Sequence, residues 1–131
     1  MHEATVGHLL RGSGDDQEVL LGKRLSVFCN GMWNGAGGKM KRHESPRIGL
    51  RREAKEEWGV WIDIWSLRHF ASIDFYHPFK DSYRLEWRVH FYQVGRWSGE
   101  PAPIEGFSEL KWYRPEKFPY EKMLIDDQYW M

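Results

Sequence analysis

The stretch that decides the fold is residues 38–60, which read GKMKRHESPRIGLRREAKEEWGV. Its second half predicts a helix, because Ser45 is a favourable N-cap and Pro46 is favourable at the first helical position. The helix is expected to run to about Trp58 and to end at Gly59. Predicted strands lie on both sides of it in the sequence, so we expect a helix packed on a sheet.

Three carboxylates are expected to share one face of this helix. Glu53, Glu56 and Glu57 stand at positions i, i+3 and i+4, a spacing that places side chains on one face. Like charges so spaced repel by roughly 0.2–0.5 kcal/mol per pair in an isolated helix. The face is therefore either a solvated surface or a site for a hard cation such as Mg²⁺, which binds carboxylates and substrate phosphates. Arg52 precedes Glu56 by one helical turn and is expected to pair with it.

The remaining elements follow from hydrophobic alternation and turn residues. The expected strands are 5–10, 18–22, 60–74, 83–93 and 110–113, with a turn at 77–82 and a last helix at 120–131. Residues 23–38 are rich in glycine and show no helical period, so they are interpreted as a long irregular loop, a kind of segment that often carries function. Together these elements predict a mixed sheet with helices packed on it.

The composition is that of an ordinary folded domain. A chain of 131 residues fits one domain, so residues 1–131 are expected to form a single unit. The 19 basic and 19 acidic residues balance, which argues against stable nucleic-acid binding. No apolar run approaches the roughly 18–20 residues of a membrane span, and no signal peptide is apparent. We expect a cytoplasmic protein that does not bind membranes and is either a monomer or a homodimer.

The stretch resembles the Nudix box, the signature of the Nudix hydrolases. The fixed positions of that box are met by Gly38, Glu44, Arg52, Glu53, Glu56, Glu57 and Gly59. The resemblance implies an α+β Nudix fold, an α/β/α sandwich around a mixed sheet, and hydrolysis of a nucleoside diphosphate linked to another group. It also implies that Mg²⁺ or Mn²⁺ is held by Glu53, Glu56, Glu57 and the backbone carbonyl of Gly37, with Glu44 and Arg52 bracing the site. The general base is one of the three helix carboxylates or a loop carboxylate, Glu105 or Glu109.

A second resemblance concerns the substrate. Residues 31–39, GMWNGAGGK, and the segment 112–130 resemble the corresponding parts of the 8-oxo-dGTP diphosphatases of the MutT type. That resemblance implies a base pocket formed by Phe28, Asn34, Leu124, Asp126 and Asp127, and phosphate contacts from Lys23, Gly38 and Lys39. From the residues alone, Asn34 could also be a turn residue and the Asp126–Asp127 pair a helix cap.

The implied activity is hydrolysis of oxidised purine nucleoside triphosphates, such as 8-oxo-dGTP, to the monophosphate and pyrophosphate. One alternative keeps the chemistry and changes the substrate to ADP-ribose, a dinucleoside polyphosphate or an unmodified nucleoside triphosphate. Another is a Nudix domain that only binds nucleotides. The three carboxylates argue against that second alternative, because a pure binder has no need of a cluster that repels itself.

Overall fold

A computed structural model gives the structure of the chain and describes residues 2–25, 31–114 and 116. Its strands are β1 (His2–Arg11), β2 (Glu18–Arg24), β3 (Trp33–Asn34), β4 (Ala36–Lys39), β5 (Trp61–Ile62), β6 (Leu67–Phe79), β7 (Ser82–Val94), β8 (Trp97–Ser98) and β9 (Phe107–Tyr113). Its helices are α1 (Pro46–Trp58) and two 3₁₀ turns, η1 (Gly14–Asp16) and η2 (Ile64–Ser66). The expected last helix, 120–131, lies outside the described residues.

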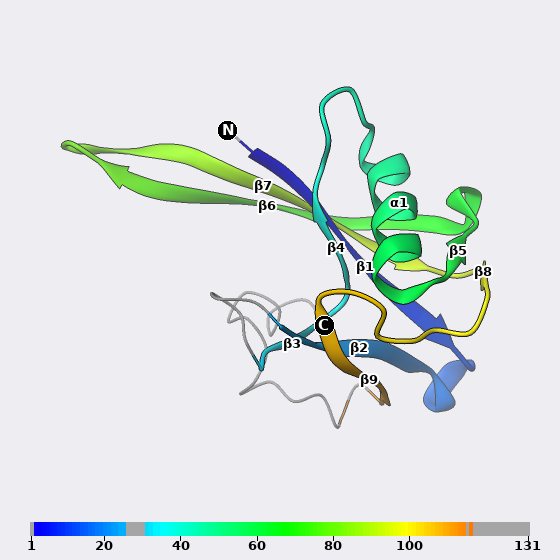
Figure 1. Cartoon of the computed structure of the whole chain (residues 1–131). Coiled ribbons are helices and arrows are strands. Elements are labelled where there is room, and N and C mark those ends of the chain that lie inside the picture. The colour runs from blue at the N-terminus through cyan, green and yellow to red at the C-terminus, as the bar shows by residue number, and fades with distance from the viewer. Residues whose placement is uncertain (1, 26–30, 115, 117–131) are drawn as a thin grey trace.

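Strand β1 is the centre of a mixed sheet (Figure 1). One edge of β1 pairs in parallel with β7, from His2 opposite Trp87 to Leu9 opposite Val94. The other edge pairs antiparallel first with β4 and then with β2. Strand β2 carries the sheet on to β3 and β9, and β7 carries it on to β6. The predicted α+β fold with a mixed sheet is confirmed.

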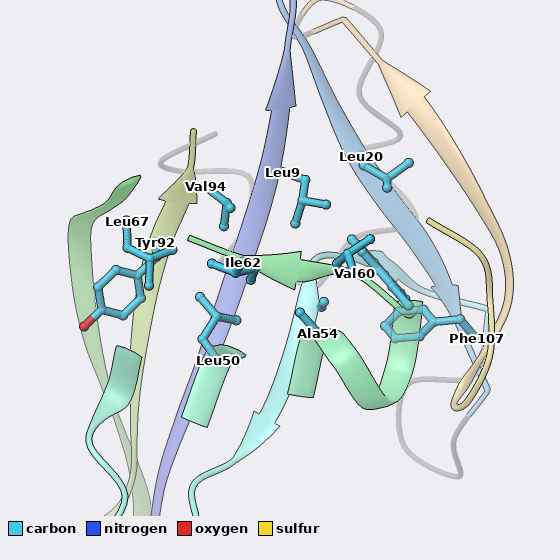
Figure 2. Packing of buried hydrophobic residues seen from close by; sticks show 12 residues of the cluster. Leu9, Leu20, Leu50, Ala54, Val60, Ile62, Leu67, Tyr92, Val94 and Phe107 are labelled. Atoms are coloured by element: carbon cyan, nitrogen blue, oxygen red, sulfur yellow. The ribbon is translucent and has the colours of Figure 1, made fainter. Parts of the chain in front are cut away.

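Helix α1 has the predicted bounds and packs against this sheet. The Ser45 hydroxyl accepts a hydrogen bond from the N–H of Ile48 at 3.3 Å, and Gly59 ends the helix at φ 70°. Leu50 and Ala54 are fully buried against core residues from β1, β2 and β7 (Figure 2). Burying a leucine stabilises a fold by about 1.5–3 kcal/mol, so this packing fixes where the polar face of the helix lies.

The expectation of one strand over residues 60–74 is wrong. The chain forms β5, turns through η2 and begins β6 at Leu67. Asp63 causes the break, because its Oδ1 accepts a hydrogen bond from the N–H of Trp65 at 2.9 Å. Such a bond to nearby backbone offers the chain an alternative to the strand ladder.

Two further boundaries differ from the prediction. The turn expected at 77–82 is confined to Lys80 and Asp81, where Lys80 adopts φ 55°. The expected loop 23–38 instead includes the end of β2, all of β3 and most of β4, which were not predicted because glycine has low strand propensity. Strand β4 nevertheless forms, because its backbone pairs with β1 from Ala36 to Lys39.

The β6–β7 hairpin extends beyond the start of β1 and projects from the rest of the molecule (Figure 1). Burial therefore changes along β7: Tyr83 is 71% exposed, whereas Phe91 is 3% exposed. The alternation predicted a half-buried strand over 83–93, and that holds only for its second half. No helix of the described residues is long and apolar enough to span a membrane.

Candidate active site

The carboxylate of Glu57 lies where α1 meets β4. Its Oε1 accepts a hydrogen bond of 2.8 Å from the backbone N–H of Gly37. Gly37 has φ 147°, and a Cβ there would collide with the backbone oxygen of Thr5 in β1. Glycine at this position therefore lets β4 lie directly on β1, while the Gly37 N–H donates to Glu57 and the Gly37 carbonyl accepts from Arg24.

Glu57 is an unusual carboxylate because its side chain is 11% exposed. The pKa of Glu57 is raised to about 7, mainly by burial and to a smaller extent by the nearby charge of Glu53. The Arg24 guanidinium and the Gly37 N–H act in the opposite direction, because both stabilise the ionised form. Its proton is therefore exchanged near neutral pH, which is the range in which a carboxylate can act as a base.

Arg24, at the end of β2, donates to four oxygens around Glu57. Its Nε donates to Oδ1 of Asn34 at 2.8 Å, and Nη1 donates to Oε2 of Glu57 at 3.3 Å. Its Nη2 donates to the carbonyls of Gly35 at 3.4 Å and Gly37 at 3.1 Å. The guanidinium also lies over the ring of Phe107, with its carbon 4.4 Å from the ring centroid.

Arg24 was not predicted from the sequence, whereas its neighbour Lys23 was. Alternation alone does not separate the two residues, because Leu20 and Leu21 are both buried and both faces of β2 are therefore apolar. Only the structure shows that the face of Leu20 is the one that meets α1 and Phe107.

Arg52 gathers the other carboxylates of the helix. It donates to both oxygens of Glu44, at 2.6 and 3.0 Å, to Glu53 at 3.0 Å and to Glu56 at 3.1 Å. The hydrogen bond to Glu44 raises the pKa of Arg52 further above its usual range, and Arg52 in turn lowers the pKa of Glu44. The predicted pairing of Arg52 with Glu56 is confirmed. Glu44 holds the guanidinium that orients the two helix carboxylates.

The donors at this site suit a hard divalent cation. They are carboxylate oxygens of Glu53, Glu56 and Glu57 and the carbonyl of Gly37, all of the type that Mg²⁺ and Mn²⁺ prefer. The missing side chain of Gly38 leaves room for such an ion, because a Cβ there would lie 3.1 Å from the Glu53 carboxylate. Within residues 2–25, 31–114 and 116, no three acidic, His or Cys side chains are gathered around a common point suited to a metal. The two arginines hold these oxygens instead.

The other predicted residues fall into three groups. Asn34 is buried beside Arg24, whereas Lys23 is half-buried in β2 and Lys39 is exposed at the end of β4. Of the two candidate loop carboxylates, Glu105 donates its backbone N–H to the backbone carbonyl of Glu57 at 3.2 Å, and Glu109 lies opposite Lys23 in the β2–β9 ladder. The predicted residues Phe28, Leu124, Asp126 and Asp127 lie outside the described residues.

The chain is similar to several known proteins. The family profile of the NUDIX domain matches residues 1–131. The chain is 34% identical to an oxidized purine nucleoside triphosphate hydrolase of Danio rerio over 112 residues, 86% of this chain and 68% of the relative. It is 34% identical to an 8-oxo-dGTP diphosphatase of Buchnera aphidicola subsp. Acyrthosiphon pisum (strain APS) over 101 residues, 74% of this chain and 75% of the relative. The crystal structure of a MutT NUDIX hydrolase from Burkholderia pseudomallei shares the fold, with a TM-score of 0.75 at 23% identity over 90% of this chain and 86% of that one.

Proposed function

Because the chain belongs to the Nudix family, we propose that it hydrolyses oxidised purine nucleoside triphosphates such as 8-oxo-dGTP. The products are the nucleoside monophosphate and pyrophosphate, so the enzyme removes damaged precursors before they enter DNA. It acts on soluble nucleotides in the cytoplasm, as a single domain that is either a monomer or a homodimer. Two of the relatives described above support this substrate class, because one is named an oxidized purine nucleoside triphosphate hydrolase and the other an 8-oxo-dGTP diphosphatase.

One observation carries the proposal. A single guanidinium, that of Arg24, touches both Asn34 and Glu57. Asn34 is the predicted reader of the purine edge, and Glu57 belongs to the carboxylate face of the helix. This proximity supports a site in which one nucleotide contacts Asn34 with its base and the carboxylate face with its phosphates.

The carboxylate face supplies the hydrolytic chemistry. Glu53, Glu56, Glu57 and the Gly37 carbonyl would hold Mg²⁺ or Mn²⁺, which when bound neutralises phosphate charge and lowers the pKa of a bound water. Arg52 keeps Glu53 and Glu56 oriented through the contacts described above. The proton acceptor is one of the three helix carboxylates or a loop carboxylate, Glu105 or Glu109.

The substrate is recognised at its two ends. We assign the purine edge to the Asn34 amide together with Asp126 and Asp127, with Phe28 and Leu124 as the walls of the base pocket. Lys23, Lys39 and the backbone of Gly38 are assigned to the phosphates. A base that leaves buried polar groups unpaired loses about 1–3 kcal/mol per group, so a pyrimidine is expected to bind poorly.

A substrate panel scored by kcat/KM tests the proposal. It compares 8-oxo-dGTP, dGTP, dCTP and ADP-ribose, each with Mg²⁺ and with EDTA, by release of pyrophosphate or phosphate. The oxidised purine is expected to exceed the pyrimidine by at least about tenfold, the ratio that corresponds to 1.4 kcal/mol. Faster turnover of ADP-ribose than of every triphosphate would assign the site to the alternative substrates. No turnover with any compound would indicate a domain that only binds.

A further inference from the structure

Arg24 occupies the oxygens that a metal ion would use. Two of its four acceptors, Oε2 of Glu57 and the carbonyl of Gly37, belong to the predicted metal ligands. A third, Oδ1 of Asn34, belongs to the predicted base pocket. Because the Arg24 side chain is 18% exposed, these contacts are made largely out of water, where they are strong.

We propose that Arg24 is a built-in counter-ion, which holds the metal ligands while no metal is bound and is displaced from them when the ion enters. Its departure also frees Oδ1 of Asn34, so that metal binding and recognition of the base are linked through one side chain. The inference rests on the proposed function, because it takes the metal ligands and the base-reading residue from there.

Charge favours the exchange. A guanidinium and a divalent cation that share these two oxygens in a buried site repel each other strongly. The Glu57 carboxylate needs a cationic partner in either state, because an unpaired buried charge is costly. Arg24 supplies that partner in the metal-free protein, and the ion supplies it afterwards.

The contact between Arg24 and Asn34 extends the effect of the exchange to the predicted base pocket. The Oδ1 of Asn34 accepts from Nε of Arg24 and so is occupied. Once Arg24 leaves, the same oxygen can accept from an N–H on a purine edge. Linkage then requires the reverse effect: a base bound to Asn34 favours the displaced Arg24 and tightens the binding of the metal.

The neutral variant Asn34→Ala separates this exchange from simple repulsion between cations. It removes one anchor of Arg24 without changing any charge, and is therefore expected to lower the Kd for Mn²⁺ by about two- to tenfold, the worth of one hydrogen bond. Arg24→Gln should lower it further, by about tenfold or more. Ser108→Ala is the matched control, because its hydroxyl contacts the Lys23 carbonyl in the same strand pair and leaves Arg24 untouched.

The experiment titrates Mn²⁺ into the full chain and its variants by electron paramagnetic resonance, and follows the Arg24 Nε–H signal by NMR while Mg²⁺ is added. Exchange predicts tighter Mn²⁺ binding by Asn34→Ala, and a shift and loss of protection of the Nε–H signal in the unmutated protein. An unchanged Kd in Asn34→Ala together with an unmoved Nε–H signal would overturn the exchange and leave the proposed hydrolase intact. If the unmutated chain bound neither ion, the exchange and the metal-dependent function would both fall. Should Arg24→Gln fail to fold, Asn34→Ala and the NMR signal decide alone.

Discussion

Gly37 and Glu57 are joined by a hydrogen bond of 2.8 Å, from a strand N–H to a helix carboxylate. This bond fixes Oε1 of Glu57 relative to β4, whose Gly37 carbonyl belongs to the same site. Glu56 is different, because its side chain is 47% exposed and is held by Arg52. The helix therefore presents one buried carboxylate that is held by a backbone N–H and by Arg24, and others that are held by Arg52.

Removing the charge of Glu57 should abolish most activity. In Glu57→Gln an amide oxygen can still accept from Gly37, so the fold is expected to persist, while kcat falls by about 10²–10⁴. The measurement is steady-state turnover of 8-oxo-dGTP, with circular dichroism to check the fold. Glu86→Gln, on the exposed hairpin, serves as the control and should keep full activity. Full activity of Glu57→Gln would remove this residue from the mechanism.

The same residue predicts how stability depends on pH without metal. Burial raises the pKa of Glu57 from 4.5 to about 7, so the folded chain keeps a proton that the unfolded chain loses. This proton adds up to about 3 kcal/mol to the free energy of unfolding. The addition is fully present below pH 4.5 and is lost as the pH rises through 7. Denaturant unfolding of the unmutated protein and Glu57→Gln from pH 4.5 to 8 measures it. Parallel curves for the two proteins would contradict the assignment.

His8 predicts a dependence of stability on pH in the opposite direction. Its side chain is buried between Phe70 and Phe91, and burial lowers the pKa of His8 to about 4. Below pH 6.5 the unfolded chain binds a proton on His8 that the folded chain does not bind. The free energy of unfolding therefore falls by about 3 kcal/mol as the pH drops towards 4. His8→Phe keeps an aromatic ring and should flatten the unfolding curve between pH 6.5 and 4. Equal acid sensitivity in both proteins would show that other groups dominate.

Arg52 should not be replaceable by lysine. Its planar guanidinium reaches three carboxylates at once, and one ammonium group cannot reproduce that geometry. Arg52→Lys is expected to lower kcat/KM by about tenfold or more. Arg51→Lys, at the preceding position of the same helix, is the control for the loss of an arginine. Equal kcat/KM in the two variants would mean that charge alone is needed.

Divalent ions should stabilise the fold. An ion that binds only the folded chain adds about 2.7 kcal/mol at one hundred times its Kd. The melting temperature is therefore expected to rise with Mg²⁺ or Mn²⁺ and to return to its starting value with EDTA. The rise should shrink in Glu53→Gln, which loses one of the proposed ligands. A melting temperature indifferent to millimolar Mg²⁺ would contradict a metal site in this fold.

The helix could be predicted because its signals are local. Ser45, Pro46 and Gly59 act on neighbouring backbone, and the spacing of Glu53, Glu56 and Glu57 determines their common face whatever surrounds them. Arg52 belongs to the same category, since its partner Glu56 lies one turn away. Such features can be predicted without knowledge of the tertiary structure.

The features that were missed depend on distant partners. Strand β4 contains two glycines and forms because β1 lies beside it, which no window around residues 36–39 can show. Arg24 acquires its role from Glu57, which lies 33 positions away in the chain. The exposed half of β7 has the same alternation as the buried half and differs only in what covers it.

The parallel pairing of β1 with β7 has a consequence for the newly made chain. His2 lies opposite Trp87, so the ribosome must release the chain as far as Trp87 before that ladder can close. Until then, β1 and α1 exist with one sheet edge open to non-native pairing, and contacts so distant in sequence form slowly. A chain truncated before Ser82 would carry all the helix carboxylates and still lack the strand that completes the sheet beneath them.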